Sequence, residues 1–333
     1  MVSNSAQIES RSDVRGESSK AIAVVLEGPE RLAVERVDLD PAGPGDVVVD
    51  VEWSAISTGT ERLLYLGRMP PFPGMGYPLV PGYEAVGRVR QSASDAQEAP
   101  RVGTRVFVGG ARCFGKVRGL FGAAASRLVV PASRAIVVAE DLGERAVLLA
   151  LAATAYHALH QPCARLPDLI VGHGVLGRLL ARLALAAGGP IPVVWERDAV
   201  RREGAEGYVA IDPQKDDRHD YASIYDVSGD ASLLDDLIAR LAPGGEVVLA
   251  GFYSERLNFA FAPAFMREAR FRVAAEWKPG DLAAVQELAA SGRLSLDGLI
   301  THRAAAGAAQ DAYRTAFADA RCLKMVLDWR ATA

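Results

Sequence analysis

Short apolar runs alternate with polar turns between Ala21 and about Ala139, a pattern typical of β-strands joined by tight connections. The runs that predict strands lie at 21–28, 32–39, 46–57, 84–90, 104–110 and 126–131. PAGPG at 41–45 predicts the turn between the second and third runs, because glycine and proline favour turn conformations. So many short strands in one segment favour a compact β-rich domain or a distorted barrel.

The pattern changes near Leu142, where residues 144–160 form a long apolar stretch of strong helix formers and predict a buried connecting helix. After Pro167 strands and helices alternate. Strands are expected at 168–172, 192–196, 208–211, 223–229, 246–252 and 271–277, with helices at 175–188 and 233–242. This alternation predicts a parallel, doubly wound sheet and an α/β fold. The closing CLKMVLDW at 322–329 predicts a strand that returns to the first domain.

These patterns divide the 333 residues into two expected domains, for which the chain is long enough. Residues 21–152 and 291–333 are assigned to the β-rich domain, and residues 153–290 to the Rossmann-type domain. Residues 1–20 are polar, carry both charge signs and are expected to be a disordered tail.

Composition narrows the class of protein only slightly. The net charge of -4 gives no electrostatic reason to expect nucleic acid as a partner. Cys113, Cys163 and Cys322 are far apart and predict neither a disulfide framework nor a structural metal site. No stretch has the apolar core of a signal peptide or the length of an integral membrane segment. We therefore expect a cytoplasmic protein.

The strongest candidate site is a glycine-rich turn directly after the strand at 168–172. Its residues are Gly172, His173, Gly174, Val175, Leu176 and Gly177, and they open the long helix at 175–188. In that context the G-x-G-x-x-G spacing predicts a dinucleotide site, because the glycines allow a tight turn, an approach to the pyrophosphate and close helix packing. His173 is expected to shape the turn and not to perform chemistry. The alternative is a glycine turn that binds no dinucleotide.

The second strand of this unit ends in Glu196, which can bond the ribose hydroxyls and repel a 2′-phosphate. We therefore expect NAD as the cofactor. Three arginines follow closely, and any of them could hold the 2′-phosphate of NADP instead: Arg197, Arg201 and Arg202. Later strand ends are expected near the nicotinamide half of the cofactor, at Asp226, Ser228, Gly229 and Gly251.

The order of a strand-rich domain, a connecting helix, a Rossmann domain and a returning strand resembles the medium-chain dehydrogenase/reductase superfamily. The resemblance implies a GroES-like catalytic domain and a homodimer formed through the edge of the Rossmann sheet. Zinc-dependent members place a cysteine and a histidine ligand where this chain has Ser57, in ISTGTE at 56–61, and Tyr83, in GYE at 82–84. Hydroxyl groups are poor zinc ligands, and the four-cysteine lobe is absent from the sequence, so no metal site is expected.

Without a metal, side chains must bind the reacting oxygen and remove its proton. We expect Ser57 or Thr58 to bond the substrate oxygen, and Tyr83, Glu84 or His157 to relay the proton. Each relay candidate has a structural alternative. Tyr83 can fill the former metal position, Glu84 can pair with an arginine, and His157 can be a packed helix histidine. Glu61 is expected to be a solvated acid at a helix start.

Some segments resemble the zinc-free branch of the superfamily that acts in bacteriochlorophyll synthesis, namely 57–61, 67–84, 119–129 and 322–329. This resemblance implies oxidation of the 3-(1-hydroxyethyl) group of a chlorin-type tetrapyrrole to 3-acetyl. Apolar side chains that could line a slot for the macrocycle are Tyr65, Met69, Phe72, Met75, Tyr77, Phe114, Leu120 and Phe121. Cations that could meet its carboxylate are Arg68, Arg112, Lys116 and Arg118.

Two other functions remain open at this point. Zinc-free relatives of this architecture commonly reduce quinones or enones with NADPH, and the arginines after Glu196 are compatible with that cofactor. A protein that binds a dinucleotide without catalysing a reaction is the third possibility.

Overall fold

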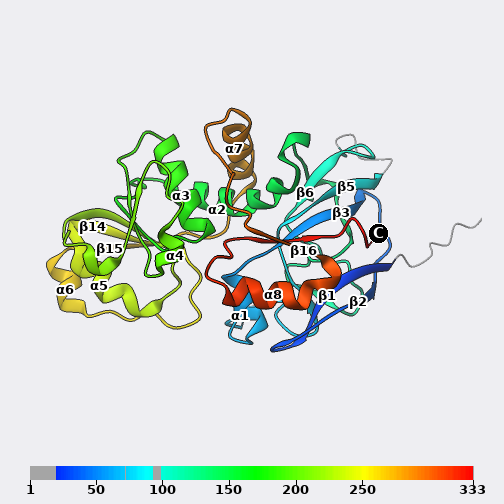
Figure 1. The fold of residues 1–333 in the computed structure, drawn as a ribbon, viewed down its shortest axis with the longest axis horizontal. Coiled ribbons are helices and arrows are strands. Elements are labelled where there is room, and N and C mark those ends of the chain that lie inside the picture. The colour runs from blue at the N-terminus through cyan, green and yellow to red at the C-terminus, as the bar shows by residue number, and fades with distance from the viewer. Residues whose placement is uncertain (1–19, 72, 93–98, 333) are drawn as a thin grey trace, which may run out of the picture.

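The computed structural model describes residues 20–71, 73–92 and 99–332. The predicted tail therefore lies outside the described residues, apart from Lys20, which begins the first strand. Figure 1 shows two lobes side by side, with helices α2 (Leu149–Leu159) and α7 (Pro279–Ala290) between them. No helix in the described ranges has both the length and the apolarity needed to cross a bilayer.

The β-rich lobe contains two sheets. Its strands are β1 (Lys20–Gly28), β2 (Arg31–Asp38), β3 (Asp46–Ile56), β4 (Leu79–Val80), β5 (Ala85–Ser92), β6 (Arg105–Val108), β7 (Arg118–Gly119), β8 (Arg127–Pro131), β9 (Ala135–Val137), β16 (His302–Ala305) and β17 (Met325–Asp328). One sheet has the order β2-β1-β4-β7, and the other has the order β16-β17-β3-β5-β6-β9, with β8 also on β3. The predicted strands of this half are confirmed.

The C-terminal segment returns to this lobe, as predicted. β17 pairs antiparallel with β3, with Met325 opposite Ile56, and β16 lies parallel to β17. Helix α8 (Ala309–Ala318) packs beside them and buries one face, which includes Tyr313. The spacing of its buried residues, Ala309, Ala312, Tyr313 and Ala316, is that of an amphipathic helix, so Tyr313 points into the lobe.

The second lobe is a doubly wound parallel sheet, which confirms the predicted fold class. Its strands are β10 (Leu169–Val171), β11 (Val193–Trp195), β12 (Val209–Ile211), β13 (Tyr221–Asp226), β14 (Leu241–Leu249) and β15 (Arg270–Val273). They lie in the order β12-β11-β10-β13-β14-β15 and are parallel throughout. The direction of winding reverses between β10 and β13, where ligands bind in such sheets. Its helices are α3 (Val175–Ala186), α4 (Ala199–Arg202), α5 (Leu234–Arg240) and α6 (Phe261–Met266).

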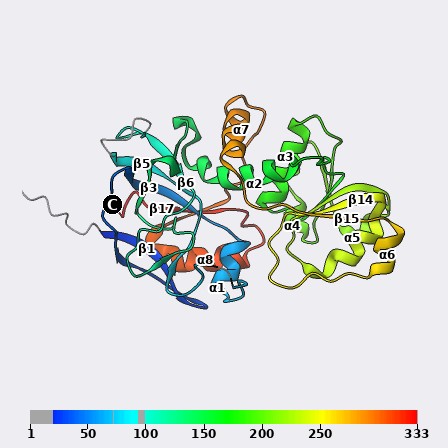
Figure 2. The same ribbon diagram turned by 180° about the vertical axis from the view of Figure 1, so that it is seen from behind.

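The connecting helix is shorter than predicted. Residues Glu140–Leu148 form a 3₁₀ segment with positive φ at Gly143, and the α-helix begins only at Leu149. Figure 2 shows α2 from behind, between the lobes, and it packs against both α3 and α7. The expected domain boundaries at 152 and 291 remain predictions, and residue 152 lies within α2.

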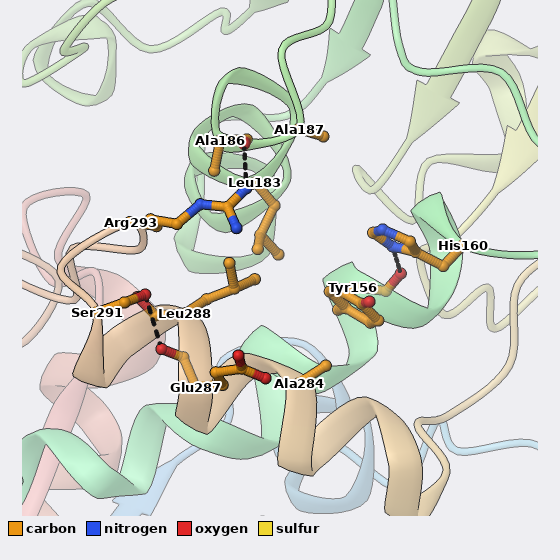
Figure 3. Close-up of a pocket in the computed structure, with 10 residues that line it drawn as sticks. All are labelled: Tyr156, His160, Leu183, Ala186, Ala187, Ala284, Glu287, Leu288, Ser291 and Arg293. Carbon is orange, nitrogen blue, oxygen red and sulfur yellow. Dashed lines mark hydrogen bonds between the residues drawn. The ribbon is translucent and has the colours of Figure 1, made fainter.

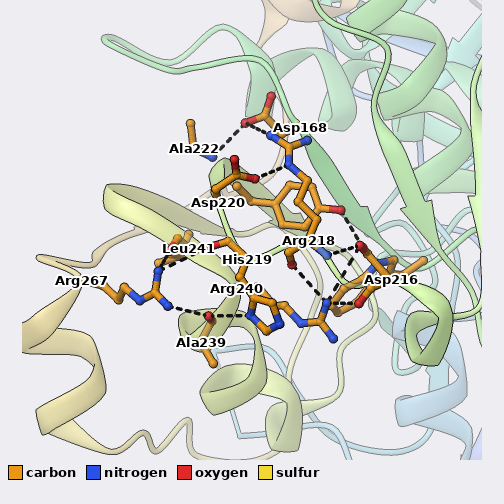
Figure 4. Close-up of polar contacts among 12 residues, drawn as sticks. Asp168, Asp216, Arg218, His219, Asp220, Ala222, Ala239, Arg240, Leu241 and Arg267 are labelled. Atoms are coloured by element: carbon orange, nitrogen blue, oxygen red, sulfur yellow. Dashed lines mark hydrogen bonds and ion pairs between the residues drawn. The ribbon is translucent and has the colours of Figure 1, made fainter.

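A polar cluster fastens the loop between β12 and β13 to the sheet. Figure 4 shows Asp216, Arg218 and Arg240 converging there. The buried Asp216 carboxylate accepts hydrogen bonds from the Trp195 indole and the Tyr221 hydroxyl, both at 2.6 Å, and from the Arg218 amide at 2.9 Å. Burial opposes ionisation, but these bonds and the Arg240 charge outweigh it and hold the pKa of Asp216 below its usual 3.8.

We expect Asp216→Asn to lower the free energy of unfolding by about 2 kcal/mol, because the substitution removes an ionised acceptor of several buried donors. The matched control is Asp217→Asn, at an exposed neighbouring acid. Because the folded pKa of Asp216 is lowered, its stabilisation is present above pH 3.8 and is lost as the pH falls through the folded value. Urea titrations at pH 7 and pH 3 measure both effects, and equal unfolding midpoints for the two variants at pH 7 would contradict this role.

Candidate active site

The glycine-rich turn joins β10 to α3, and its glycines have different physical roles. Gly172 has φ of +105°, a conformation that side chains rarely adopt. A Cβ added at Gly177 would lie 1.9 Å from the carbonyl oxygen of Gly172, so the helix can pack on the turn only without a side chain there. A Cβ at Gly174 would have no atom within 4 Å, which leaves open space beside the N-terminus of α3. This geometry suits an approaching pyrophosphate.

His173 lies beneath the turn and is fully buried. Its Nδ1 donates to the carbonyl of Arg201 at 2.6 Å, so in the neutral ring Nε2 accepts from the Tyr208 hydroxyl at 2.7 Å. Burial, followed by the charge of Arg178, lowers the pKa of His173 to about 4. The side chain is therefore a neutral brace for the turn, in line with the structural role expected for it. Val175 is also buried at the helix start, and Leu176 is half-buried.

Glu196 follows the end of β11 and reaches the glycine turn. Its carboxylate accepts hydrogen bonds from the backbone amides of His173 at 3.2 Å and Asp198 at 2.9 Å. Two of the nearby arginines are engaged elsewhere: Arg201 donates to the carbonyl of Ala320, and Arg202 donates to carbonyls of its own loop. Arg197 is the most exposed of the three, and its nearest acid is Asp230 at 3.4 Å.

The ends of β13 and β14 meet beside the turn. The Asp226 carboxylate accepts from the amide and hydroxyl of Ser228, at 2.8 and 2.6 Å, and from the Tyr253 hydroxyl at 2.7 Å. Gly229 has φ of +70°, and a Cβ at Gly251 would lie 3.0 Å from its amide nitrogen. The predicted residues Ser228, Gly229 and Gly251 are thus brought together at the point where the sheet reverses direction.

Ser57 and Tyr83, which the resemblance aligns with zinc ligands of other dehydrogenases, form a hydroxyl pair in the β-rich lobe. Ser57 directly follows β3, and Tyr83 lies two positions before β5. Because Ser54 pairs with Ala85 in the sheet, the two segments leave it at the same edge. The Oγ of Ser57 and the hydroxyl of Tyr83 lie 2.5 Å apart. Thr58, the other candidate for binding the substrate oxygen, is half-buried beside them.

Tyr83 keeps its proton under ordinary conditions. Burial is the main cause that raises its pKa, and the negative charge of Glu84 adds to it. The phenol can therefore donate or accept a hydrogen bond at neutral pH, but it does not supply a tyrosinate base.

Glu84 is held in a buried ion pair with Lys324, at 2.8 and 3.0 Å, and both residues are almost inaccessible to solvent. The expected structural alternative for Glu84 was a pair with an arginine, and the partner is a lysine from the returning segment. Both carboxylate oxygens are occupied by the same ammonium group, so Glu84 is poorly placed to pass on a proton.

Glu61 was expected to be solvated, and this expectation is wrong: it is 1% exposed, at the start of α1 (Thr60–Tyr65). Its carboxylate accepts from the amide of Ser57 at 2.9 Å and from the hydroxyl of Tyr313 at 2.6 Å. Burial is the largest cause that raises its pKa, to about 7. Sequence reasoning missed Glu61, Lys324 and Tyr313 as members of this cluster.

The side-chain hydrogen bonds of His157 go to residues outside the hydroxyl pair. His157 lies on α2, and its Nδ1 is 2.8 Å from the carboxylate of Asp281 on α7. Its ring also contacts the side-chain amide of Gln161 on the following turn. These contacts match the packed helix histidine that was the structural alternative, and they link the two helices between the lobes.

Three of the side chains expected to line the slot belong instead to the protein core, which corrects that part of the expectation. Met69, Phe114 and Leu120 are buried and belong to hydrophobic clusters. Tyr77 donates to the carbonyl of Leu64, and Tyr65 packs on Phe317. Met75 is half-buried, and Phe72 lies outside the described residues. Phe121 is half-buried and meets Tyr83 edge-on, with ring centroids 5.6 Å apart.

The donor set does not suit the catalytic zinc of this fold. Ser57 and Tyr83 offer hydroxyl groups, and the acid beside them is bound to Lys324. Within the described ranges, histidine, cysteine and acidic side chains form no group of three that could hold a metal ion.

A cavity with a volume of about 220 Å³ lies between α2, α3 and α7. Figure 3 shows the residues that line it. The lining includes Tyr156 and His160, whose rings stack at 3.7 Å, and Arg293, which donates to the carbonyl of Ala186. None of the residues that line it belongs to the predicted site. The cavity therefore gives no support for placing the substrate there.

Comparison with known proteins agrees with this architecture. Residues 43–140 match the family model of the alcohol dehydrogenase GroES-like domain. The chain is 59% identical to the 2-desacetyl-2-hydroxyethyl bacteriochlorophyllide A dehydrogenase of Cereibacter sphaeroides, over 94% of this chain and 100% of that protein. It is 58% identical to the protein of the same name from Rhodobacter capsulatus, over 92% and 98% of the two chains.

Among solved structures, an alcohol dehydrogenase from Escherichia coli CFT073 in complex with NADH superposes with a TM-score of 0.78. The match covers 93% of this chain and 99% of that one, at 22% identity, and it shows a shared fold.

Two glycine substitutions separate the packing role of the turn from its ligand-binding role. We expect Gly177→Ala to destabilise the free protein by about 2 kcal/mol, because its Cβ would collide with the Gly172 carbonyl. Gly174→Ala should leave the melting temperature unchanged but weaken nicotinamide dinucleotide binding about tenfold, because only an approaching pyrophosphate would meet the new methyl group. Thermal unfolding and calorimetry with NADH measure the two effects. Unchanged affinity in Gly174→Ala would place the dinucleotide elsewhere.

Proposed function

Because the chain belongs to the medium-chain dehydrogenase/reductase superfamily, we propose that it oxidises the 3-(1-hydroxyethyl) group of a bacteriochlorophyllide to 3-acetyl, with NAD and without zinc. The observation that carries the proposal is the 59% identity to the Cereibacter sphaeroides enzyme along that protein's full length. The reaction is an oxidation of a secondary alcohol. It needs a hydride acceptor, a group that binds the alcohol oxygen and a route for its proton.

The Ser57–Tyr83 pair is proposed to bind the alcohol oxygen. In the 2.5 Å contact one hydroxyl donates and the other accepts, and either assignment is possible. The accepting hydroxyl keeps its proton free to donate to the alcohol oxygen, and the donating hydroxyl keeps a lone pair that can accept the alcohol proton. A nicotinamide ring bound at the glycine turn would supply the hydride acceptor. Glu84 and His157 are bound to other partners, so the alcohol proton is proposed to pass through Ser57 and Tyr83 outwards to solvent.

NAD is proposed as the cofactor because of the environment of Glu196. Its carboxylate lies against the amide of His173 in the turn, where its charge would repel a 2′-phosphate. Arg201 and Arg202 are bonded to backbone carbonyls. Arg197 is the feature that favours the second candidate function, an NADPH-dependent quinone or enone reductase, since its side chain is 75% exposed and could turn toward a phosphate.

The macrocycle is proposed to approach the β-rich lobe near Phe121, whose ring edge already contacts Tyr83. The four cationic side chains expected to meet the propionate carboxylate are exposed: Arg68, Arg112, Lys116 and Arg118. The proposed location of the enzyme is the cytoplasm.

A homodimer is proposed through the edge of the Rossmann sheet at β15. Within the described residues β15 pairs on one side only, with β14. Apolar side chains around it are exposed, among them Phe261, Phe265 and Met266 on α6 and Val273 on β15. Exposed apolar patches of this kind mark protein interfaces, and an unpaired strand edge invites pairing with a second copy.

The proposed reaction is tested anaerobically with metal-depleted protein, 3-hydroxyethyl bacteriochlorophyllide a and either NAD or NADP, by following the absorbance change on acetyl formation. We expect turnover with NAD, and a loss of roughly a hundredfold in kcat for Ser57→Ala and for Tyr83→Phe. Full turnover in both variants would exclude the hydroxyl pair. Hydride transfer from NADPH to a quinone, with none from the chlorin alcohol, would favour the reductase, and dinucleotide binding without turnover would favour a non-catalytic protein.

The proposed dimer is tested by light scattering after size-exclusion chromatography. We expect Met266→Asp to give monomers, because it places a charge in the apolar patch, while its own exposure of 76% leaves the core intact. Val102→Asp is the matched control, since Val102 is 66% exposed but lies in the other lobe. The dimer proposal would be wrong if both variants and the unaltered chain had the same mass.

A further inference from the structure

Glu61 is a buried acid for which the proposed reaction has no role yet. It lies in the first turn of α1, faces the interior and is 1% exposed. The nearest buried cation, Lys324, is already bound by both carboxylate oxygens of Glu84. Since Glu84 and Lys324 cancel in charge, an ionised Glu61 leaves this cluster with one uncompensated negative charge.

The hydrogen bonds of Glu61 lead directly to the proposed substrate-binding pair. Its Oε1 accepts from the amide of Ser57, and its Oε2 accepts from the hydroxyl of Tyr313. The side chain of Ser57 then meets Tyr83 at 2.5 Å. The Glu61 carboxylate therefore links α1, the end of β3 and α8. It bonds the backbone of Ser57, whose side chain belongs to the hydroxyl pair.

The charge of Glu61 changes within the neutral range. Burial raises its pKa most, the bonds from Tyr313 and Ser57 lower it, Glu84 raises it and Lys324 lowers it, which gives about 7. Tyr83 is the remaining titratable group beside it, and it stays protonated. When Glu61 takes up a proton, one of its oxygens becomes a donor and a poor acceptor, so at least one of its two hydrogen bonds must rearrange.

We infer that Glu61 is a positioning residue that, when ionised, holds Ser57 and Tyr313 and thereby fixes the Ser57–Tyr83 hydroxyl pair. When Glu61 takes up a proton from solvent, its hydrogen bonds to Ser57 and Tyr313 loosen, and no other covalent bond forms or breaks. The inference rests on the proposed role of Ser57 and Tyr83 in binding the alcohol oxygen. The pH dependence of turnover would then arise from Glu61, a residue that does not contact the substrate.

The first test compares pH profiles of kcat for the unaltered enzyme and Glu61→Gln. We expect kcat of the unaltered enzyme to fall up to tenfold per pH unit below about pH 7, where Glu61 becomes protonated. Glutamine has one accepting oxygen and cannot ionise, so it resembles the protonated acid, and the variant should have a lower, flat profile over that range. Its KM for NAD should be unchanged, because the glycine turn belongs to the other lobe. Glu35→Gln, at an exposed acid of β2, is the matched control.

Tyr313→Phe provides a directional test. The Tyr313 hydroxyl favours the ionised form of Glu61, so its loss should move the fall in kcat to higher pH. A merely structural role of Tyr313 would lower kcat at every pH without moving the profile. The inference is overturned if Glu61→Gln keeps the unaltered profile, or if the profile of Tyr313→Phe does not move upward.

A spectroscopic test needs no substrate and keeps the inference separate from the proposed reaction. In protein with ¹³Cζ-labelled tyrosine, the signal that disappears in Tyr83→Phe belongs to Tyr83. We expect this signal to shift with a midpoint near pH 7 in the unaltered chain and to stay constant in Glu61→Gln. If the enzyme fails to oxidise the chlorin alcohol, the proposed function is wrong, while this titration still decides the coupling. A Tyr83 signal that moves identically in both proteins overturns the coupling.

Discussion

The buried ion pair between Glu84 and Lys324 is the contact on which the geometry of the candidate site depends. It joins residues 240 positions apart and lies almost entirely out of solvent. A lone charge there would carry a large desolvation cost, so each partner is tolerated only because the other is present. The pair fixes the segment that carries Tyr83 against the segment that returns from the second lobe. The same returning segment carries α8, whose Tyr313 hydroxyl donates to Glu61 at the start of α1.

The same ion pair sets the protonation of its neighbours. The negative charge of Glu84 adds to the effect of burial, and together they raise the pKa of Tyr83, which stays a phenol, and the pKa of Glu61, which comes close to 7. The positive charge of Lys324 acts in the opposite direction and lowers the pKa of Glu61. Hydroxyl groups alone are weak substitutes for a metal ion, since they carry no fixed charge. The proposed site has to gain its electrostatic character from the charged groups behind the hydroxyl pair, and in this chain those groups are Glu61, Glu84 and Lys324.

The local sequence pattern was sufficient to predict most of the fold and the glycine-rich turn of the candidate site. The alternation around β3, the returning run at β17 and the strand-turn-helix context of Gly172–Gly177 each reflect rules that act within a few residues, and all are present in the structure. The hydroxyl pair was also foreseeable, because Ser57 and Tyr83 stand beside strands that pair. The burial of Met69 and Phe114 was harder to predict, because the sequence of an apolar loop residue does not indicate whether it lines a binding slot or packs in the core.

The errors at the acidic cluster have a common physical cause. An acid in the first turn of a helix normally interacts with solvent and the helix dipole, so nothing local to Glu61 indicates burial. Its burial depends on Tyr313, 252 positions away, which covers it only because β17 carries the C-terminal segment back onto β3. Lys324 adjoins an apolar strand, where a lysine would ordinarily turn to solvent, and it points inward because Glu84 is there. Contacts between distant segments thus decide which groups titrate, and in this protein they place a buried carboxyl with a pKa of about 7 one residue away from the hydroxyl pair.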